Sequence, residues 1–141
     1  MNRNKLALIA LITLFLGGCS TFEAIRKVNI GTEFEKSSRA YLQLVRWHEM
    51  ESAMVTYVNA SLQDGYRKRI EAAGETKVVD YRIKSMDCDP VKGEATLKVE
   101  LDYYRPPSTR VLTVVDNQIW SYEGAEGNRS WRLQTLLPEF K

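Results

Sequence analysis

Apolar residues between positions 33 and 58 recur at three- and four-residue spacing, with no proline or glycine among them. This spacing puts them on one helical face and predicts an amphipathic helix, or two helices that meet at a bend. The side chains of Asn59 and Ser61 can cap a helix end, so a shorter helix is expected to follow from about Leu62, and Gly74 is expected to close it. The apolar positions of the first segment are Leu44, Trp47, Met50, Met54, Tyr57 and Val58.

After Gly74 the pattern changes to an alternation of apolar and polar residues, which is typical of β-strands with one buried face. A shift of the apolar positions near Ser85 indicates a β-bulge in the first strand. The polar residues 116–118 predict a kink or turn within the third strand. The predicted strands are 79–84, 94–104, 110–115 continued by 119–122, and 131–136.

Helices followed by strands predict an α+β fold, with the N-terminal helices packed on one face of an antiparallel sheet of about four strands. Pro106 and Pro107 end the second strand because proline cannot donate to a β-ladder. No internal repeat or low-complexity segment is evident.

The first residues have the pattern of a signal peptide. Arg3 and Lys5 precede an uncharged apolar stretch at 6–16, which is shorter than the about 20 residues that span a bilayer. The following Leu-Gly-Gly-Cys at 16–19 resembles the lipobox of bacterial lipoproteins. This resemblance implies cleavage after Gly18, acylation of Cys19 with diacylglyceryl and palmitate-like chains, and stable anchoring to a membrane. An ordinary secretory signal with an accidental cysteine is the alternative.

The lipobox divides the chain into a signal peptide at 1–18, a lipidated tether at 19–32 and a single domain at 33–141. It also implies a location in the cell envelope. In the enterobacterial sorting pattern, Asp at the position after the cysteine retains lipoproteins in the inner membrane, so Ser20 predicts the outer membrane, facing the periplasm. The apolar residues of the tether could dock on the domain.

Charge and cysteine content narrow the function classes. Two of the 20 basic residues lie in the signal peptide, so the mature chain has 18 basic and 18 acidic residues. Because it carries no basic stripe, we expect no nucleic-acid partner; the basic residues 67–69 are expected on the solvent side of a helix. Lipidation of Cys19 would leave Cys88 as the single thiol, expected to be a small buried hydrophobic residue. The segment 87–89 predicts a turn, and neither a metal site nor a cofactor is expected.

The order of elements and several aromatic residues resemble the NTF2-like superfamily between Glu33 and Lys141. The residues that carry this resemblance are Arg46-Trp47, Glu51-Ser52-Ala53, Tyr66, Trp131-Arg132-Leu133 and Leu137-Pro138. It implies a cone in which a curved sheet wraps a long helix and leaves a pocket between them. Members include isomerases, dehydratases and non-catalytic binding domains, so the fold does not select the function.

Three functions stay open. An isomerase- or dehydratase-like enzyme would use His48, the only histidine, with a carboxylate or tyrosine partner. A binding protein would hold a small apolar ligand in a pocket, although a stripe of aromatic and methionine residues at helical spacing also suits a filled core. The candidate pocket residues are Trp47, His48, Met54, Tyr57, Tyr81 and Tyr103, with Met50 beside them.

An accessory protein-interaction domain is the favoured third hypothesis. It would form a homodimer or bind an envelope protein through the outer face of the sheet, where the aromatic residues Tyr104, Trp120 and Tyr122 are expected to be exposed. A filled interior and an exposed apolar patch would favour this hypothesis, and a polar pocket containing His48 would favour the enzyme. No catalytic sequence motif is found, so we predict a non-enzymatic protein.

Overall fold

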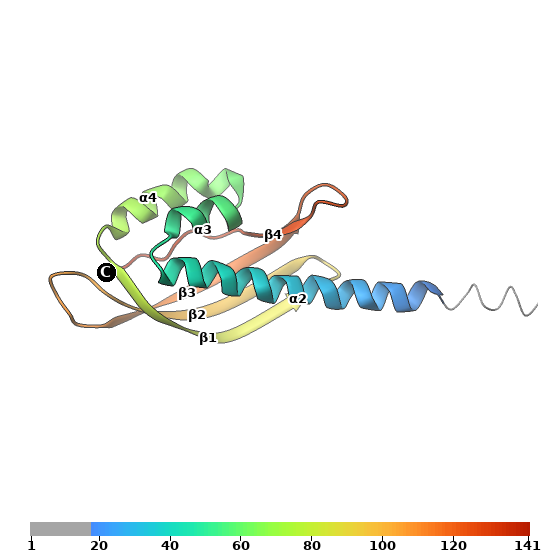
Figure 1. Cartoon of the computed structure of the whole chain (residues 1–141), viewed down its shortest axis with the longest axis horizontal. Coiled ribbons are helices and arrows are strands. Elements are labelled where there is room, and N and C mark those ends of the chain that lie inside the picture. Colours follow the sequence, from blue (N-terminus) through green and yellow to red (C-terminus); the bar gives the residue numbers. More distant parts are fainter. Residues whose placement is uncertain (1–17) are drawn as a thin grey trace, which may run out of the picture.

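The computed structural model describes residues 18–141, with side chains from Thr21 onward (Figure 1). The predicted signal peptide up to residue 17 lies outside the described residues, as does the side chain of Cys19. The described chain is α+β, with N-terminal helices packed against a four-stranded antiparallel sheet that does not close into a barrel. The predicted fold class is confirmed.

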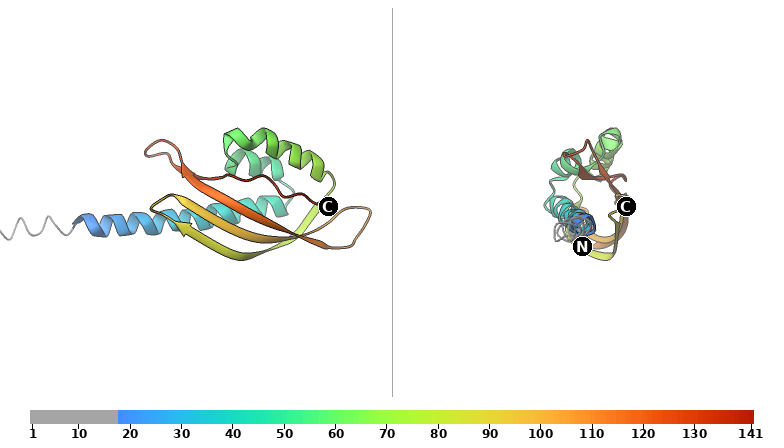
Figure 2. Two further views of the ribbon diagram at one scale, coloured as in Figure 1. Left: turned by 180° about the vertical axis from the view of Figure 1, so that it is seen from behind. Right: turned by 90° about the vertical axis from the view of Figure 1, so that its right-hand side faces the viewer.

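The elements follow one another as expected, helices before strands. The strands form a simple meander in the order β1-β2-β3-β4. Figure 2 shows that the helices lie on one side of the curved sheet. No described helix is long and apolar enough to cross a membrane. The elements are α2 (Gly18–Arg46), α3 (Met50–Tyr57), the short 3-10 helix η1 (Ala60–Leu62), α4 (Gln63–Ala73), β1 (Lys77–Asp89), β2 (Glu94–Tyr104), β3 (Leu112–Glu123) and β4 (Ser130–Leu133).

Helix α2 begins much earlier than predicted, because residues 18–32 are helical and continuous with the rest of the helix. The predicted helix start at Glu33 is therefore wrong. Ile30 and Phe34 are buried on one face, and the Trp131 indole donates to the Ile30 carbonyl at 3.0 Å. These contacts outweigh the cost of about 1 kcal/mol for Gly31 inside the helix. The first turns of α2 project beyond the sheet (Figure 1).

The first amphipathic segment is two helices that meet at a bend, one of the two predicted alternatives. His48 has a left-handed backbone with φ of 66° between α2 and α3. After α3, the Asn59 side chain accepts from the Ser61 backbone N–H at 2.9 Å and caps η1. Gly74 ends α4 with φ of 53°. The predicted caps at Asn59 and Gly74 are thus confirmed, whereas the Ser61 hydroxyl lies inside η1 and donates to Asn59 Oδ1 at 2.7 Å.

The sheet has one regular strand beside one bulged edge strand. Every second residue of β2 from Ala95 to Tyr103 is buried, which confirms the predicted alternation. The pairing of β1 with β2 shifts at Lys84, next to the predicted bulge site, and also at Val79, where no bulge was predicted. The Arg46 side chain at the end of α2 donates to the Val79 carbonyl at 3.2 Å, so the second bulge has a tertiary partner.

Strand β3 is continuous, and the predicted kink at 116–118 is wrong. Asp116 and Gln118 are buried on the inner face of the sheet, in register with Val99 and Leu97 of β2. Their side chains are hydrogen-bonded inside the protein, so two polar residues occupy core positions without breaking the strand.

The pairing of β3 with β2 shows that two of the three aromatic residues predicted to be exposed on the outer face are not exposed there. Trp120 is fully buried on the inner face, two residues from Gln118. Tyr122 also faces inward, where its ring lies 5.4 Å from that of Trp131. Only Tyr104, paired with Lys77, lies on the outer face. The sheet's outer face is therefore less aromatic than predicted.

The fourth strand is shorter than predicted and ends at Leu133. The remaining chain runs back across the inner side of the sheet toward the start of β3 (Figure 2). Leu137 and Phe140 of this C-terminal segment are buried, and the Tyr103 hydroxyl donates to the Lys141 carbonyl at 2.7 Å. The segment covers inner-face residues that β4 does not reach.

Candidate functional site

The six predicted pocket residues, Trp47, His48, Met54, Tyr57, Tyr81 and Tyr103, do not form one site. Trp47 is 70% exposed and lies outside the interior. Met54 is buried on α3, and Tyr57 is partly buried with its ring 6.2 Å from that of Trp120. Tyr81 is half-buried on β1, and Tyr103 contacts the C-terminal segment. The structure distributes them over the surface, the core and two separate strands.

His48 lies on the surface, in the turn between α2 and α3. Its Nδ1 is 2.9 Å from the Arg46 carbonyl, which is the one hydrogen bond of the ring within the described chain. A general base needs a carboxylate or tyrosine that orients it, and no such partner contacts this ring among residues 21–141.

A buried polar cluster that sequence reasoning missed lies on the inner face of β3. The Gln118 amide donates to Asp116 Oδ2 at 2.7 Å, and the Trp120 indole donates to Gln118 Oε1 at 3.0 Å. Burial raises the pKa of Asp116 to about 6, although the hydrogen bond from Gln118 acts in the opposite direction. The alternation of β3, followed through 116–118 without a kink, was the signal that could have revealed the cluster.

Two tyrosines on the helices form a second buried pair. The hydroxyls of Tyr41 on α2 and Tyr66 on α4 lie 2.7 Å apart, and both rings are fully buried. Burial raises the pKa of both phenols, and the charge of Asp116 raises them further. Both tyrosines therefore stay protonated and neutral near pH 7, which suits a structural hydrogen bond better than proton transfer.

Asp116 also borders an open groove of about 570 Å³. One wall is residues 113–117 of β3, and the other is the C-terminal segment from Leu136 to Lys141 with Arg69 of α4. Arg69 pairs with Glu139 at 2.6 Å, so the second carboxylate of the groove is already neutralised. Consecutive residues of β3 line the groove, which shows that the edge of this strand is open to it.

The chemistry that this arrangement offers is limited. Asp116 can hold a proton near neutral pH, but its hydrogen-bond partner is an amide that neither accepts nor supplies a proton. Within residues 21–141, no group of three or more His, Cys, Asp or Glu side chains could hold a metal ion. Residues 87–89 belong to the end of β1 rather than to the predicted turn, which follows at 90–93. Cys88 is half-buried, and burial raises the pKa of its thiol.

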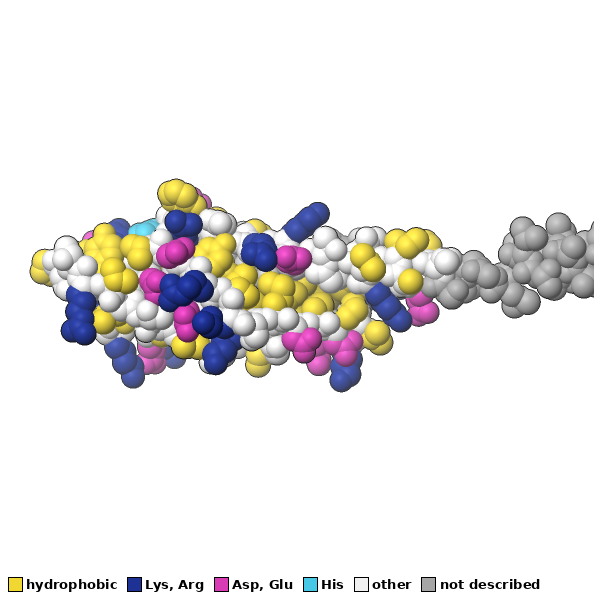
Figure 3. All heavy atoms as spheres, turned by 90° about the horizontal axis from the view of Figure 1, so that it is seen from below, with side chains coloured by type: hydrophobic (Ala, Val, Ile, Leu, Met, Phe, Trp, Pro, Cys, Tyr) yellow, Lys and Arg dark blue, Asp and Glu magenta, His cyan; other side chains and the backbone are white. Residues whose placement is uncertain are grey.

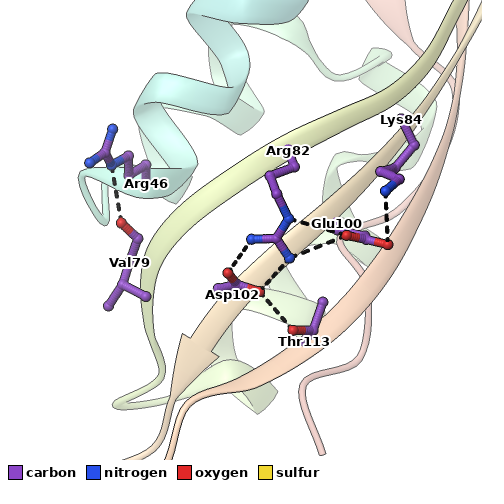
Figure 4. Close-up of polar contacts among 7 residues, drawn as sticks. All are labelled: Arg46, Val79, Arg82, Lys84, Glu100, Asp102 and Thr113. Atoms are coloured by element: carbon purple, nitrogen blue, oxygen red, sulfur yellow. Dashed lines mark hydrogen bonds and ion pairs between the residues drawn. The ribbon is translucent and has the colours of Figure 1, made fainter.

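Ion pairs join β1 and β2 across one part of their outer face (Figure 4). Arg82 binds both Asp102 and Glu100, and Lys84 lies 3.7 Å from Glu100. Thr113 of β3 donates to Asp102 at 2.7 Å. Hydrogen bonds from Arg82 and Thr113 lower the pKa of Asp102 to about 2. This patch of the outer face is charged and internally paired.

Exposed apolar side chains gather in three other places. Figure 3 shows a band of them on the face where α2 and β1 meet, and the inner positions of β1 are only half-buried. Phe22, Ile25 and Val28 are exposed on the projecting turns of α2. Val111, just before β3, and Val115 and Ile119 on its outer face are 54%, 44% and 52% exposed, and they alternate with exposed Thr113 and Asn117. These three apolar residues are called the β3 stripe.

Comparisons of the chain with protein-family models, curated proteins and solved structures found no match. The resemblances to bacterial lipoproteins and to the NTF2-like superfamily therefore stay predictions.

Proposed function

We propose that this protein is a lipid-anchored lipoprotein facing the periplasm from the outer membrane, with a domain that acts as a non-catalytic protein-interaction module. The observation that carries the interaction role is the filled interior. Trp120, Trp131, Tyr41 and Tyr66 are each at most 1% exposed and occupy the space between helices and sheet. The anchoring role rests on the lipobox and on Cys19.

The exposed surface supports the same proposal. Monomeric proteins rarely leave contiguous apolar surface uncovered, and such surface often marks a partner site. The band between α2 and β1 is such a surface, and the β3 stripe adds three separated apolar side chains outside the filled core. The placement of His48 on the surface, away from any carboxylate partner, removes support from the enzyme alternative.

A small-molecule binder remains the second candidate because of the open groove beside Asp116. Its volume of about 570 Å³ lies within the range of ligand pockets. The groove is bordered by charged Arg69, Glu139 and Lys141, so it suits a polar ligand better than the apolar one predicted from the sequence.

Anchoring is tested by labelling cells with radioactive palmitate while they express the full chain. We expect label in the native protein and in Cys88→Ser, and none in Cys19→Ser. Label that persists in Cys19→Ser, or no label in the native chain, would contradict the anchor.

The interaction role is tested by native mass spectrometry of the full chain released from detergent micelles. A second protein subunit in the complex is the expected result. A co-purified small molecule on a monomer would instead favour the groove as a ligand site.

A further inference from the structure

Strand β3 has an open edge over residues 112–118. Strand β4 pairs with β3 only from Trp120 to Glu123, and the last bond on that side joins the Gln134 N–H to the Ile119 carbonyl at 2.7 Å. In an antiparallel sheet, residues that direct both backbone groups to the same side alternate with residues that direct them to the other. The backbone N–H and C=O groups of Ile119 point away from β2, and the pairing of β3 with β2 runs without a register shift to Leu112. Thr113, Val115 and Asn117 therefore direct their N–H and C=O groups to the open edge.

These groups are unpaired in the described chain, since none of residues 113, 115 and 117 makes a backbone hydrogen bond on the open side within residues 18–141. Exposed edges of this kind recruit further strands unless bulges or charges protect them. The opposite edge of the sheet has such protection, because β1 carries bulges at Val79 and Lys84 and exposed charged side chains. The open edge of β3 has no bulge, and its outward side chains carry no charge. The groove between this edge and the C-terminal segment is the space that a further strand would enter.

We propose that the open edge of β3 pairs with the same edge of a second copy of this chain, in antiparallel orientation about Val115. The window available for pairing is bounded by the start of β3 at Leu112 and by the β4 pairing beyond Ile119, so its midpoint is Val115. Two antiparallel copies overlap fully only when Val115 faces Val115 of the second copy. This inference rests on the proposed interaction role and names the partner.

The side chains match in that register. Thr113 lies opposite Asn117 of the other copy, and Val111 and Ile119 lie just outside the two ends of the paired window. The outward side chains of this window are uncharged, so no like charges oppose each other, whereas Asp116 points inward and lies opposite Val114. The three residue pairs that face the edge would each exchange two backbone hydrogen bonds.

The small contact area makes the dimer weak in solution and favours its formation at a membrane. Seven residues at about 3.4 Å per residue give a contact about 24 Å long, which covers only a few hundred Å² per copy, below the about 800 Å² per partner of stable complexes. The dimer is therefore weak in dilute solution. Two copies anchored to one membrane have a higher effective concentration, which favours pairing there.

The test uses the full, lipidated chain in membranes, with Cys88→Ala to remove the second thiol. Facing residues of a hydrogen-bonded pair have Cα atoms about 5.5 Å apart, within the range of a disulfide. We expect Val115→Cys to give a dimer of twice the chain mass under mild oxidation, roughly tenfold faster than the matched control Val91→Cys. Val91 is 73% exposed in the turn between β1 and β2 and lies away from the β3 edge.

A second substitution tests the pairing without relying on the disulfide geometry alone. Added to the Val115→Cys chain, Ile119→Lys alters an exposed side chain and should slow the crosslink about tenfold, whereas Val91→Lys should leave its rate unchanged. Equal crosslinking of the Val115→Cys and Val91→Cys chains would overturn self-pairing. A disulfide adduct of the Val115→Cys chain with a protein of another mass would overturn it as well.

Palmitate labelling of the same samples separates the two proposals. A labelled Val115→Cys chain that forms no disulfide dimer refutes only the dimer. An unlabelled chain refutes the anchor.

Discussion

The buried carboxyl of Asp116 makes the stability of the domain depend on pH in a predictable direction. Burial raises its pKa to about 6 from an ordinary 3.8, so between these values the folded chain holds the proton more tightly than the unfolded chain. Its contribution is thus fully present below pH 3.8, is lost as the pH rises through about 6, and does not return above it. At about 1.4 kcal/mol per pKa unit, the loss is about 3 kcal/mol.

The substitution Asp116→Asn removes this titration while keeping a side chain of similar size and an acceptor for Gln118. Its amide hydrogens carry their own cost in a buried position, but that cost does not vary with pH. We therefore compare the two chains at pH 4 and pH 8. The free energy of unfolding of the native chain should fall by about 2.4 kcal/mol more over this range than that of Asp116→Asn, because at pH 4 the unfolded carboxyl is already more than half ionised.

The assay is urea unfolding of the unlipidated chain from Ser20, with Cys88 kept reduced, followed by tryptophan fluorescence. The three tryptophans include Trp120, which contacts the polar cluster directly. Asp87→Asn, at an exposed position of β1, serves as the control for loss of a surface carboxylate. Parallel pH profiles for the native chain and Asp116→Asn would show that Asp116 is hydrated and would refute the reasoning.

Two further predictions concern the backbone and the tyrosine pair. Gly31→Ala should stabilise α2 by about 1 kcal/mol, because nothing lies within 4 Å of the added methyl. Gly124→Ala should destabilise the domain by more than that, since φ is 125° and the Asn128 carbonyl oxygen lies 2.5 Å from the new Cβ. Thermal unfolding should therefore shift in opposite directions for the two variants, and shifts in the same direction would contradict this geometry. Replacing Tyr41 or Tyr66 alone by Phe leaves one buried hydroxyl unpaired and should cost about 1–3 kcal/mol, while the double replacement should cost less than the two single costs combined. Additive costs in a double-mutant cycle would contradict the direct hydrogen bond.

Local patterns predicted the elements whose stability depends on their own sequence. Strand β2 alternates without exception from Ala95 to Tyr103, so its buried face could be assigned from period alone. The bulge near Ser85 was visible as a change of phase in the same period. The inclusion of Ile30 in α2 was not predictable, because Ile30 is held by Trp131, a residue 101 positions later in the chain.

The candidate site was harder to predict for the same physical reason. Asp116 and Gln118 are polar residues that belong on a surface unless buried partners satisfy them, and those partners are each other and Trp120. Trp47 was assigned to the apolar helical face by its spacing, but the bend at His48 ends the helix there and directs Trp47 to solvent. The spacing of apolar residues does not predict the residue at which a helix ends.

In strand β3 the residues proposed to affect association lie on one face and those that affect pH-dependent stability lie on the other, so the two effects can be changed independently. Odd-numbered residues such as Val115 and Ile119 face outward beside the open edge, and even-numbered residues such as Asp116 and Gln118 face the core. A charge at Ile119 should therefore alter association and leave the pH dependence of unfolding intact, because it touches no core contact. Asp116→Asn should do the reverse, since its position opposite Val114 in the proposed dimer requires no charge. If one substitution changed both readouts, the alternation that underlies both arguments would not hold at this strand.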